Sequence, residues 1–242
     1  MKVRKTAYAI VAALLAVVLL RCFVATPYLI PSVGMENSLY RGERILVNKW
    51  SYGLRLPFMA WWGYHRWPDR PVKQGDIVVF NNPGNLSQPV IDRRETFISR
   101  CIGTPGDTLL IDSLFDVVPD MPQAIVHKPK PLIVPGRGAT LRVYPWNRTL
   151  LCNTLVLHEG KRAEIKGDTL FVEGKPVHFC RFSKDYYWVT ANNAANLNDS
   201  RLFGFVPKDH IIGKAALIWF SKEEDTDLFS GYRWERMWTR VQ

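Results

Sequence analysis

Fourteen uncharged, almost wholly apolar residues, 7–20, stand near the start of this 242-residue chain and constrain its fold more than any other feature. Arg21 interrupts the run, and a shorter apolar stretch continues to Thr26. As a helix that rises about 1.5 Å per residue, residues 7–26 would span roughly 30 Å, the thickness of a bilayer core. Arg21 would then lie near the outer end, where its side chain reaches the lipid headgroups.

The flanking charges predict the orientation of this helix. Lys2, Arg4 and Lys5 precede it, and basic residues favour the cytoplasmic side of a membrane. A cleavable signal peptide is the alternative, but the residues before Pro27 make a poor cleavage site. We therefore expect residues 1–26 to be a cytoplasmic tail and an uncleaved transmembrane anchor, with the rest of the chain outside the cytoplasm.

The charge of the chain indicates a lipid partner rather than nucleic acid. The formal net charge is +10, but the basic residues are spread along the chain and form no known DNA- or RNA-binding signature. Attraction to anionic headgroups explains the sign equally well. Nine tryptophans and twelve phenylalanines also suit a protein that lies against lipid.

After Pro27 the sequence is typical of β-structure. Short β-branched or aromatic runs bounded by glycine and turn residues predict strands. The predicted strands of the first unit are residues 44–48, 76–80, 96–102, 186–189 and 211–220.

Residues 108–185 form a second predicted unit. Residues 116–137 are rich in proline and basic residues and are expected to be a loop, while residues 163–179 alternate strand and turn as in a β-meander. Helix signals beyond the anchor are weak, and residues 227–238 are the best candidate. The predicted fold is mainly β: one β domain of residues 27–107 and 186–242, a second β domain inserted at 108–185, and one N-terminal helix.

Residues 49–73 carry Phe58, Trp61, Trp62, Tyr64 and Trp67 among glycine, proline and arginine. One interpretation is a loop that covers the core. The other is an exposed apolar surface that dips into the outer leaflet of a membrane.

The four cysteines leave two states open. Cys152 and Cys180 are a candidate disulfide in an oxidising compartment, or two free thiols. With His158 and His178 they match none of the common structural zinc patterns, so we expect neither a metal nor another cofactor.

Several motifs resemble the bacterial type I signal (leader) peptidases, and the resemblance covers about nine-tenths of the chain. The matching stretches lie at residues 31–39, 42–57, 75–80, 100–107, 199–207 and 213–215. The run Ser-Tyr-Gly-Leu-Arg-Leu-Pro at residues 51–57 is most similar to enzymes of Bacteroides-like bacteria.

The resemblance implies a Ser–Lys dyad, in which a neutral lysine takes the proton of the nucleophilic serine. In this chain Gly34 stands at the serine position and Ser99 at the lysine position. Leu197 replaces the serine that steadies the lysine. We therefore interpret the dyad as degenerate, because a serine hydroxyl is far too weakly basic to replace the amine.

Other family positions are retained. The resemblance implies that Ser32 supplies the oxyanion hydroxyl, with turn capping as the alternative role, and that Asp199 and Arg201 form a structural ion pair. It also places substrate against Ser32, Val33, Gly34, Met35 and Ile98.

Three functions remain open at this point. The first is a non-catalytic homologue that binds the signal peptides of preproteins, membrane lipid or an active signal peptidase paralogue. The second is an active serine endopeptidase with a rearranged site, such as Ser32 or Ser38 with Lys49 as the base. The third is a structural envelope protein. For all three, the resemblance implies a single-pass protein of the inner (cytoplasmic) membrane with a periplasmic main domain.

Overall fold

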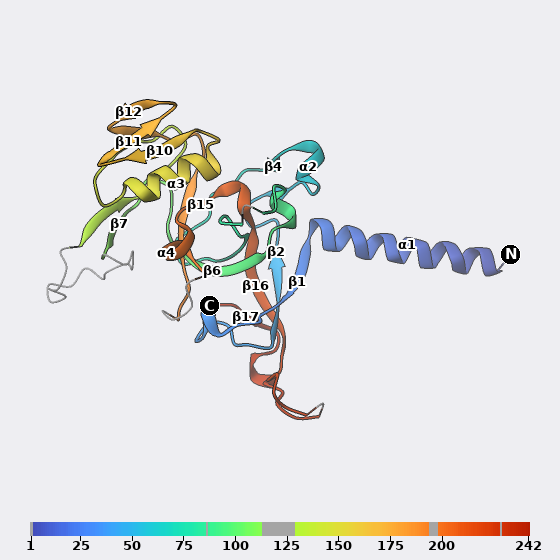
Figure 1. Cartoon of the computed structure of the whole chain (residues 1–242). Helices are drawn as coiled ribbons and strands as arrows, with labels where there is room; N and C mark the ends of the chain where they lie inside the picture. The colour runs from blue at the N-terminus through green and yellow to red at the C-terminus, as the bar shows by residue number, and fades with distance from the viewer. Residues whose placement is uncertain (1, 86, 113–128, 194–197, 228) are drawn as a thin grey trace.

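The computed structural model describes residues 2–85, 87–112, 129–193, 198–227 and 229–242. A 22-residue helix, α1 (Lys2–Phe23), projects from the β-structure as an isolated rod (Figure 1). Among the described residues, no helix meets both the length and the apolarity needed to cross a membrane.

An antiparallel sheet of eight strands forms the centre of the molecule, as expected from the short β-branched runs. Its order is β1-β2-β16-β5-β6-β14-β15, with β17 paired to β16. The strands are β1 (Ala25–Leu29), β2 (Glu43–Asn48), β5 (Ile77–Asn81), β6 (Thr96–Gly103), β14 (Tyr186–Thr190), β15 (Val206–Pro207), β16 (Ile211–Ser221) and β17 (Thr239–Arg240). The predicted strands at 44–48, 76–80, 96–102, 186–189 and 211–220 are therefore confirmed to within two residues at either end.

The central sheet is buried on both faces, because alternate residues of a strand point to opposite sides. On β5, Ile77 and Val79 join one apolar cluster, while Val78 and Phe80 join another. Gly213 on β16 passes so close to β2 that a Cβ atom there would lie 2.5 Å from the carbonyl oxygen of Asn48. A side chain at this position would therefore push two paired strands apart.

The connection from β2 to β5 crosses the surface beside α1. It contains β3 (Leu54–Arg55), the short helix α2 (Met59–Trp62) and β4 (Arg66–Trp67). No residue of α2 is buried, and its tryptophans are 79% and 65% exposed. Within residues 49–73, the short helix thus fits the exposed-surface interpretation, whereas Tyr52 and Val72 belong to the core.

The elements between Thr108 and Arg181 form a smaller lobe on the opposite side of the sheet from α1 (Figure 1). It contains β7 (Thr108–Ile111), β8 (Lys130–Ile133), β9 (Thr140–Arg142), α3 (Arg148–His158), β10 (Ala163–Lys166), β11 (Thr169–Val172), β12 (Lys175–Val177) and β13 (Phe179–Arg181). Strands β10–β12 form the expected meander. Most of the loop expected at 116–137 lies outside the described residues.

Helix α3 was not anticipated from the sequence, so the lobe is not purely β. It forms because Leu151, Leu155 and His158, spaced by four and three residues, bury one face against the lobe. The core of the lobe also takes in Tyr186 and Trp188 of β14.

The prediction of a helix at 227–238 is wrong. The described part of this segment contains only a 3-10 turn, Trp234–Arg236, followed by the start of β17 at Thr239. Gly231 has a left-handed backbone (φ 77°), and Tyr232 bridges back to Lys222 as in a hairpin. Pairing with the preceding strand therefore overrides the weak helical preference of the segment.

The candidate disulfide is also absent, because the thiols of Cys152 and Cys180 are free. Both are buried in the apolar core of the lobe. Burial raises the pKa of Cys180 to about 11, so its thiol is protonated near neutral pH.

Candidate functional site

The candidate site begins where the chain leaves β1. Ser32 has an extended backbone and precedes a 3-10 helix, η1 (Val33–Met35). Gly34 and Met35 are buried, whereas Ser32 and Val33 are exposed. Met35 belongs to the apolar cluster under the sheet, and half-buried Ile98 packs against the same cluster. The structure therefore brings four of the expected substrate positions together in η1 and its cap, with Ile98 beside them on β6.

The backbone at position 34 does not require glycine. A 3-10 helix has φ between about −50° and −70°, which every L-residue adopts. The left-handed glycines of this chain lie elsewhere, for example at Gly42 and Gly106. What glycine removes at position 34 is thus a side chain, and with it any nucleophile.

Ser99 lies in the middle of β6 and is completely buried. It pairs across the sheet with Val78, and its hydroxyl has no hydrogen-bond partner within the described part of the chain. A buried hydroxyl is seldom left unsatisfied in a folded protein. Strand β6 packs beside η1, but Ser99 shares a face of the sheet with Val78, whereas Met35 of η1 clusters with Ile98 on the other face. Leu197, the third altered position, lies outside the described residues.

Lys49 lies at the opposite end of β2 from Ser38, one of the two serines for which it is a candidate base. Its amine donates to the carbonyl oxygen of Arg21 (2.8 Å) at the end of α1. The Ser38 hydroxyl instead accepts hydrogen bonds from Arg100 (2.7 Å) and Asn192 (3.0 Å). Ser38 lies at the Glu43 end of β2, and the length of that strand, about 3.3 Å per residue, separates the two positions.

A loop that follows β14 holds η1 in place. The backbone N–H of Asn193 donates to the carbonyl oxygen of Gly34 (3.1 Å), and the Asn192 amide donates to the carbonyl oxygen of Glu36 (2.9 Å). The loop is fixed in turn by Asp199, whose carboxylate accepts from the backbone N–H of Ala191 (2.8 Å). No motif in the sequence predicts this role for the two asparagines.

Asp199 and Arg201 form an ion pair with a 2.7 Å contact. Both side chains are almost fully buried, at 0% and 5% exposure. Asp199 also caps helix α4 (Ser200–Phe203) by accepting from the backbone N–H of Arg201 (2.9 Å). The pair therefore supports the loop that clamps η1 and does not itself face the site.

Two open strand edges flank η1. Within the described residues, β1 pairs with β2 alone, and residues 96–99 of β6 pair with β5 alone. The curled sheet brings these two strands to one cavity of about 550 Å³, which Tyr28 of β1 and Thr96 of β6 both line. An extended peptide between the two edges would find unpaired backbone groups on both sides.

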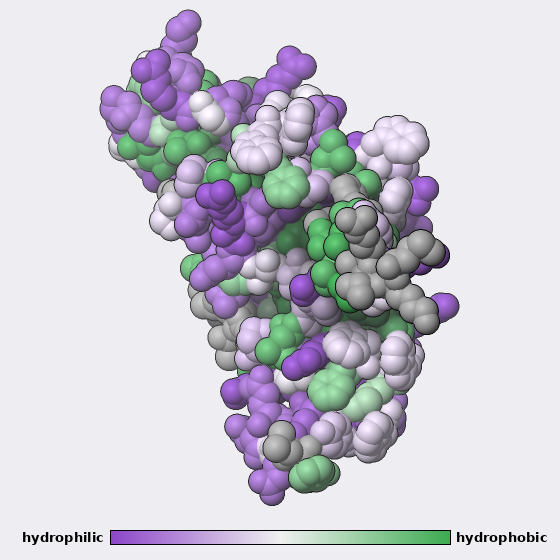
Figure 2. All heavy atoms as spheres, turned by 90° about the vertical axis from the view of Figure 1, so that its right-hand side faces the viewer, coloured by the Kyte–Doolittle hydropathy of each residue, from purple (hydrophilic) through white to green (hydrophobic). Residues whose placement is uncertain are grey.

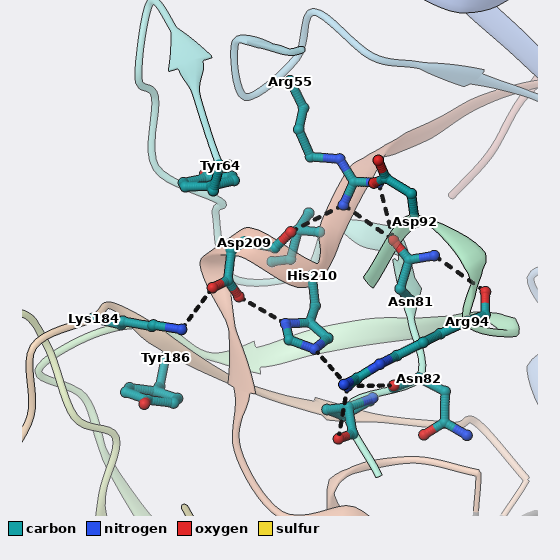
Figure 3. A network of polar contacts seen from close by, with 12 residues as sticks. Arg55, Tyr64, Asn81, Asn82, Asp92, Arg94, Lys184, Tyr186, Asp209 and His210 are labelled. Atoms are coloured by element: carbon teal, nitrogen blue, oxygen red, sulfur yellow. Dashed lines mark hydrogen bonds and ion pairs between the residues drawn. The ribbon is translucent and has the colours of Figure 1, made fainter. Parts of the chain in front are cut away.

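The wall of this cavity rests on a network of polar contacts, shown in Figure 3. Arg55 forms an ion pair with Asp92 (3.0 Å) and donates to the Asn81 side chain and to the backbone carbonyl of Asp209. The Asp209 carboxylate in turn binds His210 and Lys184, each at 2.7 Å. The network therefore links the cavity to the start of β14 and the lobe.

Aromatic side chains gather on the face from which α1 projects. Figure 2 looks at this face, where pale ring-shaped side chains form two groups. The most exposed aromatic residues of the segment around α2 and of the C-terminal segment are Phe58, Trp61, Trp62, Trp67, Phe229, Trp234 and Trp238. Such a surface suits the boundary between lipid and water. Among the described residues no group of His, Cys, Asp and Glu could hold a metal ion.

Comparison with known proteins identifies the family. The family model for signal peptidases, peptidase S26, matches residues 3–115 and 177–220, which is more than half of the chain. Signal peptidase I of Pseudomonas aeruginosa is 32% identical over 86% of this chain and 69% of the relative, and that of Aquifex aeolicus is 31% identical over 86% and 80%. Signal peptidase I of Helicobacter pylori is 25% identical over the whole chain and 96% of the relative. This chain belongs to the signal peptidase (peptidase S26) family.

Proposed function

We propose that this protein binds the signal peptides of preproteins at a membrane surface and does not hydrolyse them. One observation carries the proposal: neither position of the dyad holds a reactive group. Gly34 has no side chain, and Ser99 offers only a buried hydroxyl that has no hydrogen-bond partner among the described residues. Loss of both nucleophile and base removes the covalent route and leaves at most the roughly 10³–10⁴-fold acceleration that an oxyanion hole and binding provide.

Peptide binding does not need the missing groups. Membership of the family implies substrates that carry signal peptides, and the open edges of β1 and β6 offer backbone pairing that is independent of the side chain at position 34. Met35 and Ile98 supply an apolar surface between these edges and η1.

The proposal includes an anchor formed by α1. Its apolar side chains are exposed on all sides, including Ile10, Leu14 and Val18 at 54–62% exposure, and such a helix in water would leave a large apolar area uncovered. The basic residues at its N-terminal end favour a cytoplasmic N-terminus and a periplasmic main domain. We also propose the inserted unit at 108–185, which is supported by the interruption of the family match between 115 and 177.

A cleavage and binding assay on the full chain in detergent micelles tests the function. We expect no cleavage of a preprotein at any pH at which the protein is folded, together with saturable binding of a fluorescent signal peptide measured by anisotropy. Turnover at a rate typical of the family, abolished by Ser32→Ala, would show an active enzyme with a rearranged site. Absence of both turnover and binding would favour a structural envelope protein.

A further inference from the structure

The cavity between β1 and β6 has an excess of positive charge. Three basic side chains line it, Lys49, Arg55 and Arg93, against the single carboxylate of Asp92. That carboxylate is already engaged, because it pairs with Arg55 (3.0 Å) and accepts from the backbone N–H of Met59 (2.9 Å). Burial lowers the pKa of the Arg55 guanidinium, and the negative charge of Asp92 opposes this shift without cancelling it. The surroundings therefore neutralise the positive charge of Arg55 only in part.

Apart from Asn81 and Thr96, the rest of the cavity wall is apolar or aromatic. Phe58 and Trp61 stack at its rim with ring centroids 5.8 Å apart, and Pro57, Val90 and Ile212 continue the apolar surface. Both rim rings are more than half exposed. A ligand that fits these walls carries an anionic group beside an apolar body.

The position of the cavity specifies where such a ligand comes from. Lys49 donates to the carbonyl oxygen of Arg21, and its backbone N–H donates to the carbonyl oxygen of Val24 (3.1 Å). The cavity wall is therefore joined directly to the end of α1. If α1 spans the bilayer, as proposed above, this end lies at the level of the lipid headgroups, where tryptophan side chains such as Trp61 are also favoured.

We propose that this cavity binds the headgroup of an anionic phospholipid. The phosphate lies against Lys49 and Arg93, and the start of the acyl chains lies against Phe58 and Trp61. The strand edge proposed to bind peptide near η1 and the lipid site are then two adjacent parts of one groove. Thr96 lines the cavity, and Ile98, two residues further along β6, lies at the peptide end.

Lipid titration of the full chain tests this inference. Phosphatidylglycerol and phosphatidylcholine with the same acyl chains are added to the protein in micelles, and bound lipid is counted by native mass spectrometry. We expect phosphatidylglycerol to bind about tenfold more tightly than phosphatidylcholine, which corresponds to about 1.4 kcal/mol. Arg93→Gln should reduce this preference severalfold.

Lys175→Gln is the matched control. It removes the same charge from an exposed position on β12, in the lobe on the opposite side of the sheet from α1, and should leave the lipid preference unchanged. Equal effects of the two substitutions, or no preference between the lipids, would overturn the inference. Displacement of the lipid by millimolar inorganic phosphate would show a simple anion site. Displacement by a soluble acidic peptide would show a peptide subsite instead.

Alkaline extraction of membranes separates this inference from the function on which it rests. If the protein stays in the membrane pellet but shows no lipid preference, the anchor holds and only the headgroup site is wrong. If the protein is extracted, the anchor itself is wrong.

Discussion

Gly34 and Ser99 differ in how easily the missing chemistry could be restored. The right-handed backbone of η1 accepts a serine at position 34 without strain, since the glycine there does not use a left-handed conformation. Position 99 is different, because Ser99 is completely buried in β6 and lies opposite the core residue Val78. A lysine there must place its amine near η1 or leave a charge in an apolar environment.

We therefore expect Gly34→Ser alone to fold with an unchanged melting temperature and to cleave no preprotein, because it supplies a hydroxyl without a base. Ser99→Lys alone should lower the melting temperature and also give no product. The double variant should be the first to show turnover, and its rate should stay low because Leu197 offers no hydrogen bond to hold the new amine in line. Gel-based cleavage and thermal unfolding check these expectations. Rapid cleavage by Gly34→Ser alone would mean that Ser99 does not occupy the lysine position.

The ion pair of Glu43 with Arg236 helps to hold the chain that follows η1. Glu43 is fully buried and accepts hydrogen bonds from Arg236, from the Ser221 hydroxyl and from the backbone N–H of Tyr40. Arg236 also donates to the carbonyl oxygen of Ser38 (2.8 Å), three residues after η1. Arg236→Ala leaves a buried carboxylate without its cation, and the expected loss of unfolding free energy is roughly 3–5 kcal/mol.

Urea denaturation measures that loss, and Arg240→Ala is the control because Arg240 is an exposed arginine in the same C-terminal segment. The variant Glu43→Gln/Arg236→Met, which removes both charges, should recover part of the stability lost in Arg236→Ala. A loss below about 1 kcal/mol for Arg236→Ala would show that the contact behaves as a surface ion pair.

At the level of elements, the strands and the N-terminal helix were predictable, and the helices after it were not. Strands such as β5 and β16 are buried over most of their length, so their β-branched runs are visible in the sequence. Helix α3 buries a stripe of only a few residues, and its pattern is as compatible with a loop or a strand. The supposed helix at 227–238 is broken by the return of Tyr232 to Lys222, a contact between segments that local preference does not encode.

The site could be predicted only in part for a related reason. The motifs locate η1 and β6 because they are continuous in sequence. The clamp by Asn192 and Asn193 and the shared cavity of β1 and β6 depend on the curl of the sheet, which joins residues more than 60 positions apart.

Helix α3 places His158 against His210, with ring centroids 5.4 Å apart, at the junction of the lobe with the sheet. Burial is the main cause that lowers the pKa of His158 to about 3, and it also lowers the pKa of His210. Because the unfolded chain binds protons near pH 6.5 and the folded chain does not, stability should fall as pH drops from about 6.5 towards 3. His158 contributes up to about 1.4 kcal/mol per pH unit in this window.

His158→Leu should reduce the slope of unfolding free energy against pH, because the unfolded chain then binds one proton fewer. Urea unfolding at a series of pH values between 7 and about 4 measures the slope. An unchanged slope in His158→Leu would assign the acid loss in this window to His210, whose pKa is also lowered by burial.

For the molecule as a whole, the strongest test is whether a signal peptide binds in the groove between β1 and β6. If the open edges of β1 and β6 provide the binding, backbone hydrogen bonds should carry most of the affinity. A synthetic signal peptide with a photoreactive residue should therefore cross-link near Ser32–Met35 in the full chain in micelles and be displaced by an unlabelled signal peptide. N-methylation of alternate backbone amides should weaken binding about tenfold for the set that faces a strand edge and hardly at all for the set between. Equal effects of both sets would mean that the peptide is not held as a strand, and cross-linking without competition would leave the fold with a purely structural role.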